Sequence, residues 1–346
     1  MKSNYDDFKK EQDILISKKI SQLTKAAYNE SKPEYCLICG NNQKSYCNSH
    51  SIPQFSLKQL SKNGQLITSL SLVKKEMPNL RKGIKNAGVF HTICNSCDQN
   101  FFKDYENIEK IKKKPTDIML GEIAVKNILL QISKRLIEAN LYSKQLRKVS
   151  SSIVLDEKAS ISKLDLRDYL VELEFQKDTV LNNKTNGYNI LFWDILPYKI
   201  PIACQTGLAL EYDYEGFPIN NIYNFSSDIN MQYMHIIVLP LEETSIVLAF
   251  YHKKDKAYRQ LRHQLNSITK ENTLKYINYL IISESENFYL SPDLDDKILN
   301  NQKLISLTSE NRGHPNFGQA TITELINYTR INMDEIPNFL SSEFAI

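Results

Sequence analysis

Cys36-Leu37-Ile38-Cys39 and Cys94-Asn95-Ser96-Cys97 are two cysteine pairs of equal spacing, and the second pair runs directly into Asp98. A Cys-x-x-Cys turn presents two thiolates on one side of a tight loop, and two such turns provide the four sulfur ligands that Zn²⁺ prefers. The spacing therefore predicts a structural Zn²⁺ site formed by Cys36, Cys39, Cys94 and Cys97. The metal would join distant segments and supply folding free energy. The alternative is that one pair belongs to the buried core.

Length and composition indicate an ordinary globular protein. A chain of 346 residues favours two domains over one, and 42% apolar with 24% charged residues argues against global disorder. No apolar run reaches the roughly 18–20 residues that span a bilayer, and the N-terminus lacks a signal-peptide pattern. Only Cys47 and Cys204 stand outside the pairs, which favours metal ligation in a reducing compartment. We therefore expect a cytoplasmic protein.

The net charge of +3 is unevenly distributed. Residues 1–120 carry 20 Lys and Arg against 12 Asp and Glu, whereas residues 121–346 carry 23 against 28. This asymmetry favours a polyanionic partner, such as nucleic acid, for the half that carries the cysteine pairs. The alternative is a solvated, lysine-rich surface. The predicted nucleic-acid contacts are the basic residues Lys74, Lys75, Arg81, Lys82, Lys85, Lys112, Lys113 and Lys114.

Residues 1–114 divide into an arm and a domain that contains the cysteine pairs. Residues 1–32 are predicted to be a helical arm, because apolar residues such as Leu23 and Ala27 recur at helical spacing. Residues 33–114 are predicted to form the zinc-stabilised domain. Between its cysteine pairs, the pattern predicts a short helix, a turn at Asn63-Gly64, a strand, and then a loop over residues 78–86.

The pattern of residues 115–346 predicts an α+β domain. Apolar residues from Leu120 to Leu141 predict a long amphipathic helix that ends near Gln145. A hairpin is expected from residues 235–239 and 245–251. The other predicted elements are helices at 164–175, 256–265 and 270–282, a helical tail from 292, and strands at 188–193 and 202–214. Together they predict a small, mainly antiparallel sheet flanked by helices.

Three motifs follow one another in the first third of the chain: Cys36 to Gly40, Ser49 to Pro53, and Cys94 to Asp98 with Phe101-Phe102 and Tyr105-Glu106 behind it. This order resembles zinc-stabilised HNH-type endonucleases of the ββα-metal class, over about residues 33–106. The resemblance implies an N-terminal ββα-metal, zinc-knuckle domain. In that class a β-hairpin presents a histidine, and the helix after the second zinc pair presents the last metal ligand.

The resemblance places His50 at the general base and Asp98 at the last metal ligand. Hydrolysis of a phosphodiester needs a base for the attacking water, and a neutral imidazole can provide it. It also needs a cation to neutralise the developing charge, which implies Mg²⁺ or Mn²⁺ held by Asp98. The resemblance therefore implies a metal-dependent endonuclease for nucleic acid, DNA more than RNA. By analogy with the class, the setting would be bacterial antiphage defence, with a protein partner bound through the C-terminal domain.

The sequence departs from the HNH pattern at two points. Ser49 precedes the histidine, where many HNH enzymes have a metal-binding aspartate or histidine. The central asparagine stays open among Asn86, Asn95 and Asn100. The alternatives are a His50 that packs beside the zinc site and an Asp98 that complements a helix dipole. They correspond to a non-catalytic zinc module that binds nucleic acid or a protein partner.

Overall fold

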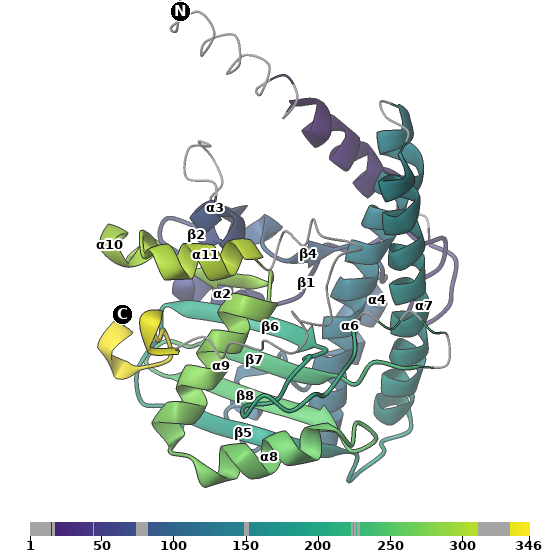
Figure 1. Cartoon of the computed structure of the whole chain (residues 1–346). Helices are drawn as coiled ribbons and strands as arrows, with labels where there is room; N and C mark the ends of the chain where they lie inside the picture. The colour runs from purple at the N-terminus through teal and green to yellow at the C-terminus, as the bar shows by residue number, and fades with distance from the viewer. Residues whose placement is uncertain are drawn as a thin grey trace, which may run out of the picture.

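The computed structural model describes residues 15, 18–43, 45–73, 82–148, 152–222, 224, 226, 229–310 and 333–346. Within these ranges the chain forms a seven-stranded sheet with helices on both faces, and a separate two-stranded ribbon (Figure 1). This mixture of helix and antiparallel sheet confirms the predicted α+β class. None of the helices in the same ranges is both long and apolar enough to cross a membrane.

The large sheet has the strand order β3-β2-β9-β6-β7-β8-β5. All neighbouring strands in this order are antiparallel, as predicted, and the sheet is larger than the small one expected from the sequence. Its strands are β2 (Gln65–Thr68), β3 (Lys82–Gly83), β5 (Tyr188–Leu196), β6 (Ile202–Leu208), β7 (Met234–Pro240), β8 (Ser245–His252) and β9 (Phe288–Leu290). The two-stranded ribbon consists of β1 (Ser49–His50) and β4 (Val89–Phe90).

Helices of different length surround the two sheets. The longer ones are α6 (Asp117–Asn140), α7 (Ile153–Leu181), α8 (Tyr258–Ser267), α9 (Lys270–Glu284) and α11 (Gln302–Glu310). The shorter ones are α2 (Gln54–Leu60), α3 (Ser69–Val73), α4 (Asn95–Phe101), α5 (Ile108–Ile111) and α10 (Asp296–Leu299). Residues 18–30 of the predicted arm are also helical, and Leu23 and Ala27 are buried.

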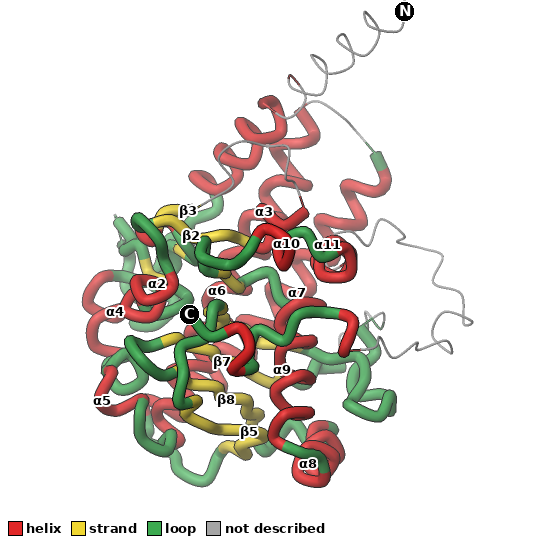
Figure 2. The backbone as a smooth tube through the Cα atoms, turned by 90° about the vertical axis from the view of Figure 1, so that its left-hand side faces the viewer, coloured by secondary structure: helices red, strands yellow, loops and turns green. Residues whose placement is uncertain are grey.

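Strand β7 shows why both faces of the large sheet need a cover. Ile237 and Leu239 belong to the hydrophobic core on one face, and Ile236 and Val238 to the core on the other, because successive side chains of a strand point in opposite directions. Helix α6 lies on the first face, with α7 packed against α6, while α8 and α9 cover the second face (Figures 1 and 2). The sheet is therefore the middle of three layers.

Two sequence patterns are confirmed closely, and two others need correction. Helix α6 is followed by a π-helical turn that ends at Gln145, and β7 and β8 form the predicted hairpin. Helix α7 begins earlier than predicted, where Ser152 accepts a hydrogen bond from the Leu155 amide. Its first residues, including Ile153, are exposed, so they show no amphipathic pattern. Strand β6 ends at Leu208, before the predicted end at 214.

The segment between the cysteine pairs contributes to the large sheet. Strand β2 pairs with β9 through Ile67 with Leu290 and Thr68 with Tyr289. The predicted Asn63-Gly64 turn is confirmed, because both residues have positive φ, at 52° and 71°. The predicted loop at 78–86 is wrong in part, since Lys82 and Gly83 form β3 on the edge of β2. Residues 33–114 and 115–346 thus share one sheet, and a domain boundary between them stays a prediction.

Candidate zinc centre and adjacent ion pairs

The β1–β4 ribbon and helix α4 position the predicted site residues. The ribbon sets Ser49 opposite Phe90 and His50 opposite Val89. Helix α4 begins directly after Cys94, which is its N-cap residue, so the helix carries Cys97 and Asp98. The two strands of the ribbon are separated in the chain by α2, β2, α3 and β3, so they do not form the direct β-hairpin that the HNH resemblance implies.

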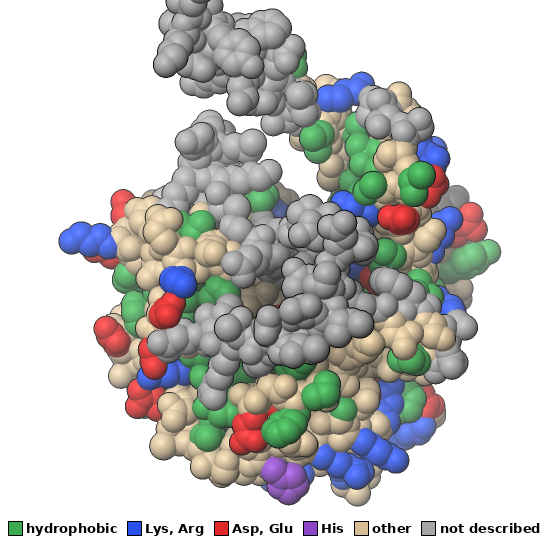
Figure 3. Space-filling model, in the orientation of Figure 1, with side chains coloured by type: hydrophobic (Ala, Val, Ile, Leu, Met, Phe, Trp, Pro, Cys, Tyr) green, Lys and Arg blue, Asp and Glu red, His purple; other side chains and the backbone are tan. Residues whose placement is uncertain are grey.

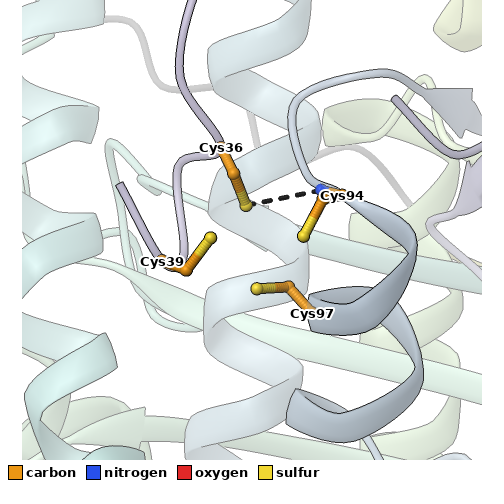
Figure 4. A group of neighbouring side chains, drawn as sticks. All are labelled: Cys36, Cys39, Cys94 and Cys97. Carbon is orange, nitrogen blue, oxygen red and sulfur yellow. Dashed lines mark hydrogen bonds between the residues drawn. The ribbon is translucent and has the colours of Figure 1, made fainter. Parts of the chain in front are cut away.

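The four paired cysteines converge as the sequence predicts. Their sulfur atoms all lie within 4.8 Å of one another, and Figure 4 shows all four side chains turned toward a common centre. The Cys94 amide donates a hydrogen bond to the Cys36 sulfur at 3.3 Å, which ties the two pairs together. A tetrahedral Zn²⁺ with Zn–S bonds of about 2.3 Å needs sulfur atoms roughly 3.8 Å apart. The cluster therefore fits one zinc ion with only a small contraction.

The thiol pKa values show why a cation belongs at this centre. Burial raises the pKa of Cys36, but hydrogen bonds from the Cys39 and Cys94 backbones outweigh burial and lower the pKa to about 7. Burial raises the pKa of Cys97 well above its ordinary value, and the neighbouring cysteine sulfurs raise it further. One thiolate thus forms easily and opposes ionisation of the next. A bound Zn²⁺ removes this conflict because it neutralises the group as a whole.

A polar pocket of about 360 Å³ opens beside the sulfur cluster. Its lining combines Cys39, Cys94 and Cys97 with asparagine, glutamine and serine residues of the flanking turns. In the described part of the chain, neither His50 nor Asp98 belongs to this lining. The pocket gives solvent access to the zinc ligands, and it does not unite the predicted base with the predicted carboxylate.

Asp98 is engaged by two donors from other elements. Its Oδ1 atom accepts a hydrogen bond from the Ser49 hydroxyl at 2.5 Å, and the same atom lies 2.9 Å from the Lys126 Nζ. Ser49 on strand β1 therefore orients the Asp98 carboxylate on helix α4, and it does not supply a further carboxylate or imidazole ligand. The resemblance predicts that Asp98 is a ligand of Mg²⁺ or Mn²⁺. In the structure, the partners of this carboxylate are instead the Lys126 ammonium and the Ser49 hydroxyl.

Lys126 is the buried centre of this ion-pair cluster. Its side chain is 1% exposed, on the middle of helix α6. The Nζ atom lies 2.8 Å from Glu106 Oε1 and 3.9 Å from the centre of the Phe102 ring, and the Tyr105 hydroxyl donates to the same glutamate oxygen. A buried ammonium must find charge-compensating partners, and Asp98 and Glu106 provide them. We call Asp98, Glu106 and Lys126 the lysine clamp.

Glu122 holds the loop that carries Glu106. It lies one helical turn before Lys126 and accepts hydrogen bonds from the amides of Asp104 and Tyr105, at 3.1 and 2.8 Å. Burial raises the pKa of the Glu122 carboxyl to about 7. Helix α6 thus holds this region through two side chains. Glu122 binds the backbone amides of the loop, and Lys126 binds the carboxylates of Asp98 and Glu106.

His50 is half-buried and has partners on its ring. Its Nε2 atom lies 3.2 Å from the Ile84 carbonyl oxygen, and the Gln54 amide nitrogen lies 3.1 Å from the same Nε2 atom and 3.3 Å from Nδ1. Because a carbonyl only accepts and an amide nitrogen only donates, these contacts fit a ring that carries a proton on one nitrogen and accepts on the other. Burial lowers the pKa of His50, and the charge on Lys126 lowers it further. The lowered pKa favours the neutral imidazole that a general base requires.

The other predicted residues fall into three groups. Asn100 donates to the Ser96 carbonyl within α4, and Asn95 lines the pocket. In the described structure these contacts do not connect either asparagine to His50 or Asp98, as the central asparagine of the HNH pattern would require. The basic residues that the structure describes, namely Lys82, Lys85, Lys112, Lys113 and Lys114, are exposed. Lys74, Lys75 and Arg81 lie outside the described residues.

Lys82 and Lys85 are the predicted basic residues that lie near a His50 contact in the sequence. They lie on either side of Ile84, whose carbonyl contacts the His50 ring, so both are within two positions of that contact in the sequence. Residues 112–114 instead follow helix α5, where Lys112 lies 3.6 Å from Glu109. In the view of Figure 3, a group of basic side chains lies at the lower right, and acidic side chains lie mainly on the left. Of the predicted basic residues, Lys82 and Lys85 therefore belong to the segment whose backbone contacts the predicted catalytic histidine.

Sequence reasoning missed Lys126 and Glu122. Both stand inside the apolar run that predicts helix α6, four residues apart. Charged residues within an otherwise buried helical face are rarely unpaired, and this was the available signal. The sequence does not reveal the ion-pair partners of Lys126. Asp98 lies on helix α4 and Glu106 in the turn after it, and both precede α6 in the chain.

Comparisons with known proteins add no relative. No protein-family model matches the chain, and no curated protein or solved structure is similar to it. The metal centre therefore stands on the geometry of four cysteines. Among the described residues, no second group of three or more His, Cys, Asp or Glu side chains converges in this way.

Proposed function

We propose that this chain is an HNH-like endonuclease that hydrolyses phosphodiester bonds in nucleic acid, with residues 33–106 as its zinc-stabilised part. The observation that carries the proposal is a neutral His50 on a β-ribbon that precedes helix α4 and the four-cysteine centre. DNA is the preferred substrate by the resemblance. A role in bacterial defence and a protein partner for the C-terminal part follow only from the analogy with the class.

In the proposed reaction, each residue has a limited task. His50 accepts a proton from the attacking water on the ring nitrogen that carries no hydrogen, while the Ile84 carbonyl contacts Nε2. Lys82 and Lys85, on the segment beside that carbonyl, attract the phosphate backbone. Zn²⁺ on the four thiolates holds the segments together and takes no part in the chemistry. Asp98 does not fit a catalytic Mg²⁺ or Mn²⁺, because its described partners are Ser49 and the Lys126 ammonium.

Plasmid nicking tests this proposal. The zinc-loaded full chain is incubated with supercoiled DNA, and separately with end-labelled single-stranded DNA and RNA, with Mg²⁺, with Mn²⁺, and with neither. Cleavage by the wild type that His50→Ala lowers at least 100-fold is the expected result. His263→Ala is the matched control, because His263 is an exposed histidine on helix α8. Equal background cleavage by wild type and His50→Ala would remove the enzymatic proposal.

A non-catalytic zinc module is the second candidate, and the lysine clamp favours it. A carboxylate neutralised by a buried ammonium suits a structural junction as well as a reaction centre. This candidate predicts salt-dependent retention of DNA that His50→Ala leaves unchanged. Reversal of charge at Lys112, Lys113 and Lys114 should weaken it, in contrast to reversal at Lys297 and Lys303 on helices α10 and α11. Absence of binding at low salt would exclude the nucleic-acid form of this module.

A further inference from the structure

The lysine clamp places a positive charge where two carboxylates meet. Asp98 Oδ1 and Glu106 Oε1 lie 2.9 and 2.8 Å from one atom, the Lys126 Nζ. One carboxylate comes from helix α4, which also carries the second cysteine pair, and the other from the loop after it. Two oxygen ligands from these elements are the kind of donor set that a divalent cation would use. The ammonium occupies the space between them.

The contacts of Lys126 are consistent with a fixed cation. An ammonium has three hydrogens: two are directed to Asp98 and Glu106, and the Phe102 ring lies on a further side at 3.9 Å. The side chain is 1% exposed, and helix α6 holds its backbone among residues that are nearly all buried. Glu122, one turn earlier, fixes the loop on the opposite side through the Tyr105 amide. Each neighbour thus stabilises the ammonium in its present position.

We propose that Lys126 is the resident cation of this centre, so that no divalent ion binds between Asp98 and Glu106. This inference holds for either candidate function. A divalent ion needs oxygen atoms at about 2.1 to 2.5 Å. An ion within that distance of both carboxylates would lie against the Lys126 ammonium, and the two like charges would repel.

The binding experiment uses Mn²⁺ as the probe. Zinc-saturated full-length wild type and Asp98→Asn are titrated with Mn²⁺, and the free ion is measured by electron paramagnetic resonance. The expected result is identical titration of the two proteins. In Lys126→Met, the freed carboxylates should bind one additional Mn²⁺, which Lys126→Met with Asp98→Asn should lose again. One equivalent bound by the wild type and lost in Asp98→Asn would overturn the proposal, and this comparison decides even if Lys126→Met does not fold.

A chelator arm separates this inference from the proposed function. Cleavage is measured with excess chelator for Mg²⁺ and Mn²⁺, after zinc analysis confirms that the four-cysteine site keeps its metal. Cleavage that depends on His50 and is equal in wild type and Asp98→Asn supports the inference. Cleavage that needs Mg²⁺ or Mn²⁺ and is lost in Asp98→Asn contradicts it. If no condition gives cleavage, the endonuclease proposal fails, and the Mn²⁺ titration still decides whether Lys126 fills the cation position.

Discussion

Replacement of Lys126 by methionine removes the charge at the centre of the lysine clamp and leaves a side chain of similar length. Asp98 and Glu106 would then face each other without a cation between them, next to the Phe102 ring. Helix α6 keeps its apolar contacts, because methionine fits the volume of the buried lysine stem. The change therefore isolates the electrostatic contribution of Lys126.

The expected loss of stability follows from the exposure of the three groups. Removal of one partner of a buried ion pair costs about 3–5 kcal/mol. Here only the lysine is fully buried, while the side chains of Asp98 and Glu106 are 25% and 34% exposed, so water compensates part of the loss. Loss of the ring contact costs about 1 kcal/mol, and burial of the methionine end offsets about 1 kcal/mol. We expect a net decrease of about 3 kcal/mol in the free energy of unfolding.

Urea unfolding of the zinc-loaded protein measures this decrease. Lys134→Met is the matched control, since Lys134 lies on the same helix and pairs with Glu286 at 3.1 Å at a more exposed site. That pair should contribute less than about 1 kcal/mol. Replacing both carboxylates in addition, as Lys126→Met with Asp98→Asn and Glu106→Gln, should restore part of the stability. Equal losses in Lys126→Met and Lys134→Met would refute the buried clamp.

Three further predictions follow from single residues. Burial raises the pKa of Glu122 from 4.5 to about 7, so the folded protein favours the protonated carboxyl and becomes less stable as the pH rises through 7. The free energy of unfolding of wild type should therefore fall by up to about 3 kcal/mol relative to that of Glu122→Gln between pH 4.5 and 7.5. Parallel urea titrations that show no difference would contradict the raised pKa. Gly88→Ala should lower the free energy of unfolding by about 2 kcal/mol more than Gly64→Ala does. Both glycines have positive φ, but only at Gly88 would a new Cβ lie 2.3 Å from the Ser51 hydroxyl. Equal unfolding midpoints of the two variants would contradict this. Cys97→Ser should lower the zinc content measured by mass spectrometry, whereas Cys204→Ser, at a buried cysteine outside the cluster, should not.

The convergence of the four cysteines and the strongest secondary structure were predictable because they depend on local spacing. Two Cys-x-x-Cys turns need only be brought together, and their thiols then converge whatever the fold around them. Helix α6 and the β7–β8 hairpin carry apolar periodicities long enough to be unambiguous. In these places the local preference and the tertiary environment agree.

The remaining features depend on contacts between distant parts of the chain. The pairing of β2 with β9 joins residues 67 and 290, and no local pattern encodes such a register. The same holds for the environment of Asp98: its position after Cys97 suggested a metal ligand, but Lys126 reaches it from another helix. His50 illustrates a smaller gap, since its neutral state was expected while its Ile84 and Gln54 contacts were not.

X-ray absorption at the zinc edge of the purified full chain tests the basis of the account most directly. A single Zn²⁺ per chain with four sulfur neighbours at about 2.3 Å is the predicted result, because the only such group among the described residues is the cluster of Cys36, Cys39, Cys94 and Cys97. A first shell that contains nitrogen or oxygen, or a folded protein whose four thiols bind no metal, would contradict it.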